Sequence, residues 1–166
     1  AIRLEGPTPS VLKRTEDLTK YVGNLGEVEE LHSHRSKILW KEIGNLSPFC
    51  QNPKSTVWRV AVPPSQASLL MERLCQQFDI SWYYDWAGGL IWIETENNPD
   101  ELHITLRDHT LQFNGHSTLV RGTKALRASV DVFAPLPKTI SELNYRVKQA
   151  FDPKAIFNPA RVYAGI

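Results

Sequence analysis

Hydrophobic and polar positions alternate most regularly in the middle of the chain, where the pattern changes period several times. "TVWRVAV" reads as a strand that Pro63-Pro64 stops, and the helical stripe Leu70, Leu74 and Phe78 follows it. Two aromatic-rich runs joined by Ala87-Gly88-Gly89 indicate a hairpin. The predicted elements are a strand at 56–62, a helix at 65–78, strands at 80–86 and 90–95, a helix at 98–113 and a strand at 116–122. This order is the ferredoxin-like split βαβ unit, so we expect an α+β fold with one antiparallel sheet and both helices on one face.

Weaker patterns flank this unit. The predicted elements before it are a strand at 2–5, a helix at 8–23, a weak strand at 27–31, a helix at 33–44 and a loop at 45–56. They indicate a partial second βαβα unit over residues 1–50, followed by the ferredoxin-like half at 51–122. Residues 123–138 look irregular, and Thr139 and Glu142 form the capping box of a last helix at 139–151. We expect its inward stripe to be Leu143, Val147 and Phe151.

Composition excludes several classes of function. Lys plus Arg total 19 and Asp plus Glu total 18, which gives no electrostatic case for nucleic acid. No run of about 18 apolar residues predicts a transmembrane helix. Cys50 and Cys75 form no metal pattern, and we expect Cys75 to be a free, half-buried thiol. The histidines lack metal-ligand spacing, so no metal site is predicted. The chain opens without Met on a strand-like stretch, which suggests a fragment lacking its N-terminal part.

The hairpin concentrates aromatic residues. Strand alternation puts Trp82, Tyr84 and Trp86 on one face and Tyr83 on the other, and Trp92 lies on the second strand. Cross-strand aromatic pairs stabilise hairpins, which is the structural interpretation. The functional interpretation is the wall of a ligand cavity or a docking face, and it predicts that at least two of Trp82, Tyr84, Trp86 and Trp92 line the sheet face that the helices leave open.

The chain ends on "FDPKAIFNPARVY", which contains two prolines at fixed spacing. Pro153 should end the last helix, and Pro159 should hold Asn158 extended. The amide of Asn158 could serve a ligand or only tie the tail down, and Arg161 could pair with an acidic group or a phosphate. Both alternatives stay open from the residues alone.

This tail resembles the C-terminal signature of FAD-linked oxidases of the vanillyl-alcohol-oxidase type. "WYYDWAGGLIWIE", "GHSTLVRG" and "VFAPLP" further resemble the FAD-binding subunits of bacterial glycolate oxidases. The chain departs from the signature at Ala155 and Ala160, where the family has glycine. If either backbone position needs positive φ, the alanine costs about 1 kcal/mol there.

The resemblance implies that residues 1–166 are a cap, or substrate, domain whose N-terminal FAD-binding domain is absent. FAD would bind the full-length protein and not this fragment, with Asn158 and Arg161 directed at the flavin. Trp82, Tyr84, Trp86, Trp92, His116 and Arg121 would line the substrate cavity. The parent protein would be an FAD-dependent oxidoreductase acting on the CH–OH group of 2-hydroxyacids, and the isolated fragment would be inactive.

The same resemblance implies partners and a location. The partners would be a catalytic flavoprotein subunit and an iron–sulfur subunit, in a cytoplasmic complex that would hold the protein at the periphery of the inner membrane. The His-rich substrate segment of the catalytic subunit has no counterpart here, so we expect an accessory, non-catalytic subunit. The alternative is a structural domain that docks partner subunits without redox chemistry of its own.

Overall fold

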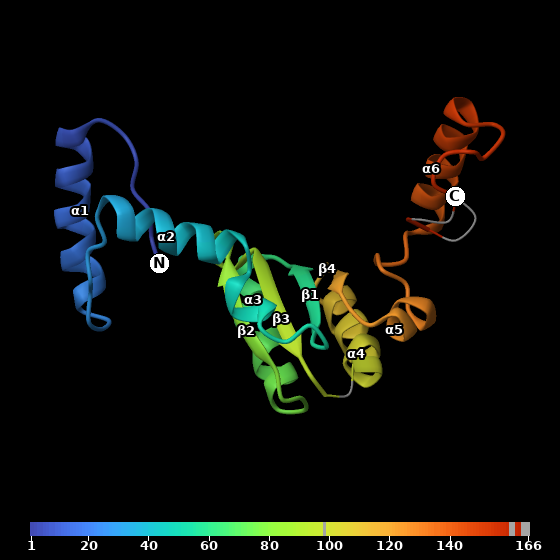
Figure 1. Ribbon diagram of the computed structural model, residues 1–166, viewed down its shortest axis with the longest axis horizontal. Helices are drawn as coiled ribbons and strands as arrows, with labels where there is room; N and C mark the ends of the chain where they lie inside the picture. The colour runs from blue at the N-terminus through green and yellow to red at the C-terminus, as the bar shows by residue number, and fades with distance from the viewer. Residues whose placement is uncertain (98, 160–161, 164–166) are drawn as a thin grey trace. The chain divides into compact units, whose positions relative to one another are not determined.

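The computed structural model describes all residues except 98, 160–161 and 164–166 (Figure 1). The chain divides into two compact units, Ala1–Pro48 and Phe49–Ile166. The first unit contains the helices α1 (Thr8–Gly23) and α2 (Ser33–Gly44). The second contains the sheet and the remaining helices.

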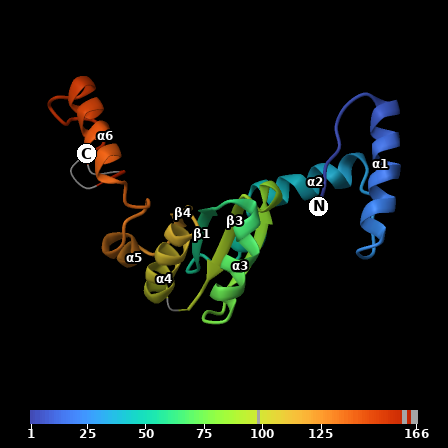
Figure 2. The ribbon, with the colours of Figure 1, turned by 180° about the vertical axis from the view of Figure 1, so that it is seen from behind.

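The second unit is built on one four-stranded antiparallel sheet. Its strands are β1 (Thr56–Ala61), β2 (Ser81–Asp85), β3 (Leu90–Thr95) and β4 (His116–Arg121), in the spatial order β2-β3-β1-β4. The helices α3 (Pro64–Cys75) and α4 (Pro99–Gln112) connect β1 to β2 and β3 to β4. Both helices lie on the same side of the sheet (Figure 2). The predicted α+β class and the split βαβ order are confirmed.

The core lies between this sheet face and the two helices. Trp58 and Val60 of β1 are fully buried, and Trp58 stands directly opposite Ile93 of β3 and Leu119 of β4. The helices contribute Leu70, Leu74, Leu102 and Leu106, all fully buried. Each such side chain contributes roughly 1.5–3 kcal/mol on leaving water, so this layer stabilises the fold.

The connection between β2 and β3 is a tight left-handed turn. The short 3-10 helix η2 (Trp86–Gly88) has φ values of 50° at Trp86 and 53° at Ala87, and Gly88 has φ 92°. The Asp85 side chain accepts a hydrogen bond from the backbone N–H of Trp86 at 2.8 Å, which holds the start of the turn. Glycine suits the third position because it has no Cβ.

The first unit differs from the prediction. Residues 2–5 and 27–31 form no strand, so the expected partial βαβα unit has only its helices. A short alternating segment cannot form a strand without a neighbour to pair its backbone groups, and the described part of this unit supplies none. The alternation correctly indicated extended chain but not pairing.

The C-terminal part differs in three ways. Residues 124–129 form the helix α5 (Lys124–Ser129), capped by the Thr123 hydroxyl, where irregular chain was expected. Helix α6 (Lys138–Phe151) begins before Thr139 with Pro137 as its N-cap, so the Thr139–Glu142 capping box is not formed. Cys75, expected to be half-buried, is exposed.

The expected inward stripe of α6 is also exposed in this chain. Leu143, Val147 and Phe151 are 51%, 48% and 84% accessible, and no residue of α6 is buried. The periodicity shows which side of a helix favours burial, but it cannot show whether this chain supplies the cover. No helix among the described residues combines the length and apolar character needed to cross a membrane.

Gly115, between α4 and β4, tests how closely this junction packs against the end of β1. A Cβ at this position would lie 2.4 Å from Val62 Cγ1 and 2.5 Å from the carbonyl oxygen of Ala61, so backbone would have to move. We expect Gly115→Ala to lower the free energy of unfolding by about 1–3 kcal/mol, the usual cost of overpacking. Chemical denaturation measures it. The control Gly23→Ala meets no atom within 4 Å and should be neutral; equal effects of the two substitutions would contradict the packing account.

Candidate functional site

One row of side chains crosses the sheet on the face away from α3 and α4. Tyr83 stands opposite Trp92, Trp92 opposite Arg59, and Arg59 opposite Thr118, so the row spans β2, β3, β1 and β4. Directly opposed residues project to the same face, and neighbours along a strand project to opposite faces. Since Trp58 and Val60 face the helices, Arg59 faces away from them.

One end of this face is covered by the segment before β1. The 3-10 helix η1 (Ser47–Cys50) buries Phe49 to 5% accessibility, with its ring 5.4 Å from that of Tyr83. Burial, then Asp85 and Cys50, raise the pKa of Tyr83 to about 12. A phenol is already protonated at neutral pH, and this shift keeps Tyr83 neutral to still higher pH.

Arg59 is the unusual member of the row. It is half-buried at the centre of the sheet, and within the described residues its guanidinium has no hydrogen-bond, ion-pair or cation–π partner. Its five N–H donors are thus left for solvent or a ligand. The Thr118 hydroxyl opposite it likewise has no hydrogen-bond partner in the described part of the chain. The open face carries a cation and a hydroxyl side by side.

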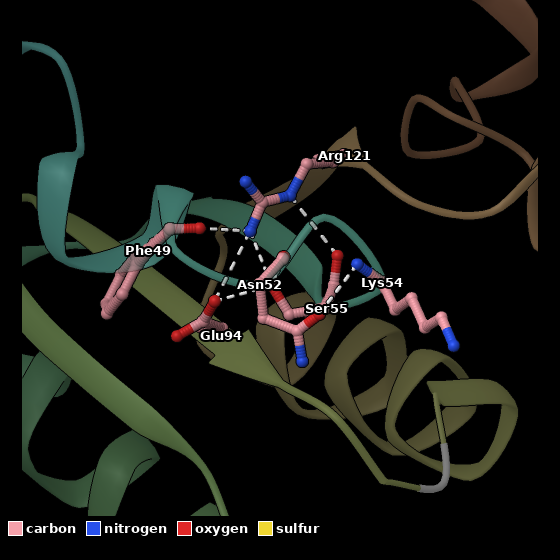
Figure 3. Close-up of polar contacts among 6 residues, drawn as sticks. All are labelled: Phe49, Asn52, Lys54, Ser55, Glu94 and Arg121. Atoms are coloured by element: carbon pink, nitrogen blue, oxygen red, sulfur yellow. Dashed lines mark hydrogen bonds and ion pairs between the residues drawn. The ribbon is translucent and has the colours of Figure 1, made fainter.

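Arg121 lies on the same face but is already engaged (Figure 3). Its guanidinium donates to the carbonyl of Phe49, to the carbonyl and hydroxyl of Ser55, and to Glu94 at 3.3 Å. The hydroxyl of the fully buried Ser55 lies 2.5 Å from the Glu94 carboxylate and 2.9 Å from the carbonyl oxygen of Asn52, and its single hydrogen serves one of these two acceptors at a time. This geometry favours a structural role for Arg121, because it ties the segment before β1 to β3 and β4.

The predicted aromatic wall is divided between two faces. Trp82 pairs with Ile93 and Tyr84 with Ile91, so both project to the helix side of the edge strand, where they stay 37% and 39% accessible. Their rings contact each other at 4.7 Å. Trp86 lies in the turn, and Trp92 of β3 projects to the open face. Of the four residues expected to supply at least two members of the open face, the register places Trp92 there and Trp82 and Tyr84 on the helix side, with Tyr83 on the open face.

His116 opens β4 opposite Ala61, which places it on the same face as Arg59 and Thr118. It is exposed. On the helix side, His103 stacks on Trp58 at 5.6 Å, and burial followed by the charge of Arg107 lowers its pKa. Arg107 is held by carbonyl oxygens of Ser117, Asp131 and Val132.

The tail is folded by an aspartate that sequence reasoning did not single out. Asp152 accepts from the backbone N–H groups of Ile156 and Phe157 at 2.9 Å each and from Lys148 Nζ at 2.7 Å. Lys148, followed by the two backbone N–H groups, lowers the pKa of Asp152 to about 2 against the opposing effect of burial. Asp152 therefore holds the first turn of the quoted tail through these three contacts, which we call the Asp152 lock.

Ala155 and Asn158 of the tail both have left-handed backbone conformations. Ala155 has φ 50°, so the departure from glycine falls on a position that favours glycine. Asn158 has φ 46°, so the extended conformation expected before Pro159 is wrong. Asparagine tolerates this region better than other residues, which explains how the local turn overrides the bias from proline. Arg161 and Ala160 lie outside the described residues.

Among the described residues, no group of three His, Cys, Asp or Glu side chains could hold a metal ion. Sequence reasoning missed Arg59 and Thr118. The sequence did contain a signal. Arg59 is the one charged residue within "TVWRVAV", and it is adjacent to the buried Trp58, so the two side chains project to opposite faces of the strand. The meaning of that signal depended on which face the helices cover.

Comparison with known proteins gives one informative similarity. Over 126 residues, the chain is 29% identical to the glycolate oxidase subunit GlcE of Escherichia coli (strain K12). The match covers 75% of this chain but 31% of the relative, so the chain spans about a third of the length of that protein. No protein-family model matches the chain. No solved structure matches it either.

Arg121→Gln should destabilise the second unit. The substitution leaves Glu94 and the buried Ser55 without their cationic partner, and we expect a loss of about 2 kcal/mol in the free energy of unfolding. Chemical denaturation followed by circular dichroism measures it. Arg146→Gln is the control, since Arg146 is exposed on α6. If both variants unfold at the same denaturant concentration, Arg121 does not clamp the sheet.

The Asp152 lock should be lost in acid. The folded pKa of about 2 lies below the ordinary 3.8, so the lock contributes fully above about pH 4 and disappears as pH falls through the folded value. We expect the protection of the Ile156 and Phe157 amides from hydrogen exchange, corrected for intrinsic rates, to fall across that window. Asp152→Asn should remove the dependence. Equal protection in the variant at neutral pH would refute the lock.

Proposed function

We propose that this chain is the substrate-side, or cap, segment of an FAD-linked flavoprotein subunit in a 2-hydroxyacid-oxidising complex. The observation that carries the proposal is the 126-residue similarity to a glycolate oxidase subunit. The tail signature and the open sheet face support it. The chain is then part of a longer polypeptide, with the parent protein an oxidoreductase and this subunit accessory to a catalytic one.

The described residues fit one end of such a cofactor and not the other. Tyr83, Trp92 and Arg59 offer a flat, partly aromatic and cationic surface that suits the ring end of a flavin or a small anionic substrate. The junction from β1 to α3 instead contains Pro63 and Pro64, which have no backbone N–H to donate to a phosphate. The pyrophosphate of FAD would therefore be held by another part of the polypeptide.

When bound, the flavin supplies the hydride-accepting chemistry for the α-carbon of the hydroxyacid. In this proposal the residues of the chain do the work around that step. The open face binds and orients the substrate, Phe49 closes one end of the face to water, and Asn158 presents its amide at the turn of the tail. Arg161 and the partner subunits complete the assembly.

A second function is favoured by a different observation. Helix α6 and the following turn expose Leu143, Val147, Phe151 and Phe157, the last at 67% accessibility. Exposed apolar groups of this extent mark protein interfaces. The alternative is therefore a docking domain that joins subunits without redox chemistry of its own. The two functions differ in whether the longer protein carries a flavin that a hydroxyacid can reduce.

The test is a spectrum of the longer polypeptide that contains this chain. We expect flavin absorbance, bleached by glycolate under anaerobic conditions when the catalytic subunit is present, whereas the 166-residue chain should be colourless and inactive. Asn158→Ala should weaken flavin retention or slow the bleaching without changing the melting temperature. Asn144→Ala on α6 is the matched control. A longer protein without flavin would leave the docking function, and a lower melting temperature with normal bleaching would make Asn158 a purely structural residue.

A further inference from the structure

The open face carries a cation that the fold itself does not use. Arg107 and Arg121 are both held by several protein oxygens, but Arg59 has no such partner in the described part of the chain. A half-buried guanidinium loses part of its hydration without gaining hydrogen bonds, which is costly unless something else completes it. Because Arg59 lies on the inner strand β1, the fold fixes the position of its backbone, and the partial loss of hydration follows from the fold itself.

The carboxylates of the same face do not neutralise Arg59. Glu94, which projects to this face opposite Val57, is engaged by Arg121 and Ser55. Asp85, which shares the face of Tyr83, accepts from the backbone N–H of Trp86. Among the described residues, the centre of the row therefore keeps a net positive charge, with no free carboxylate to compete with an anion there.

The neighbours of Arg59 define the shape of what it can bind. Trp92 stands on one side and Thr118 on the other, each directly opposite Arg59 on a neighbouring strand. A guanidinium fork matches the two oxygens of a carboxylate. A hydroxyl one strand away can bond a polar group on the carbon next to that carboxylate.

We propose that Arg59 and Thr118 form a binding site for a small 2-hydroxycarboxylate, with Arg59 holding the carboxylate, Thr118 bonding the 2-hydroxyl and Trp92 forming the wall. The site itself is inferred from the geometry of the open face. It rests on the proposed function for the class of ligand, a 2-hydroxycarboxylate, and for the choice of glycolate as the first probe. Binding by this chain needs no flavin, so the site and the proposed function can fail separately.

The test is binding of glycolate to the 166-residue chain, followed by NMR at constant ionic strength. Binding should shift the side-chain Nε–H resonance of Arg59 and leave that of the exposed Arg146 unchanged. Glycolamide, which has the hydroxyl but no carboxylate charge, should cause no shift. Acetate, which has no hydroxyl, should bind more weakly than glycolate.

Two substitutions separate the roles. Arg59→Gln should weaken glycolate and acetate binding about tenfold or more, as expected for loss of a charged hydrogen bond. Thr118→Val should leave acetate binding unchanged and remove the preference for glycolate. Arg146→Gln is the control for a general loss of charge. Circular dichroism confirms that each variant is folded, which the partial exposure of Arg59 and Thr118 favours.

Several results would overturn the site. These are equal glycolate binding by wild type and Arg59→Gln, no shift of the Arg59 resonance, or tighter binding of inorganic phosphate than of glycolate. Tighter binding of N-acetyl-aspartate amide would also overturn it, because Arg59 would then suit an acidic side chain of a partner protein. If glycolate binds as expected but the longer protein carries no flavin, the site stands and the proposed function fails.

Discussion

The architecture depends on the two faces of strand β1. Trp58 and Val60 are fully buried beneath α3 and α4, and because β1 is an inner strand they pack against residues of both neighbouring strands. The pleat then sends Val57, Arg59 and Ala61 to the opposite face. A single strand thus anchors the apolar layer and also presents the unpaired guanidinium. Moving the register by one residue would bury the arginine and expose the tryptophan.

Two arginines stabilise the fold, one on each side of strand β1. On the helix side, Arg107 of α4 lies 5.4 Å from the Trp58 ring and donates to carbonyls of β4 and of the segment after α5. On the other side, Arg121 of β4 binds the segment before β1 and the carboxylate of Glu94. Both use a guanidinium to satisfy carbonyl groups where the chain is irregular. Among the described residues, the guanidinium of Arg59 donates to no such carbonyl group, so its N–H groups are left for solvent or a ligand.

The tail shows how a short motif can combine rigidity with exposure. Asp152 holds the turn through two backbone N–H groups and Lys148, whereas Ile156 and Phe157 project outward at 65% and 67% accessibility. The order within the tail is therefore local and does not require burial. The left-handed Ala155 and Asn158 set the path of the chain between Pro153 and Pro159.

Hydrophobic period and turn chemistry by themselves determined the ferredoxin-like half of the protein. The strands, both covering helices and the Gly88-Gly89 turn are local patterns, and their order permits few topologies. The same patterns were insufficient in the first 48 residues, because extended alternation becomes a strand only beside another strand. The stripe of α6 was read correctly as apolar, but burial depends on what lies against it.

Only the tertiary structure decided which side of each strand faces the helices. Sequence alternation separated Trp82 and Tyr84 from Tyr83, but the register with β3 was needed to show that Tyr83 projects to the open face. Arg121 looked like a cavity residue until its partners Ser55, Glu94 and Phe49, distant in sequence, were brought to it. Arg59 was visible in the sequence as a charge in an apolar strand. Its lack of a partner is a property of the assembled sheet, since pairing depends on contacts between segments that no local pattern specifies.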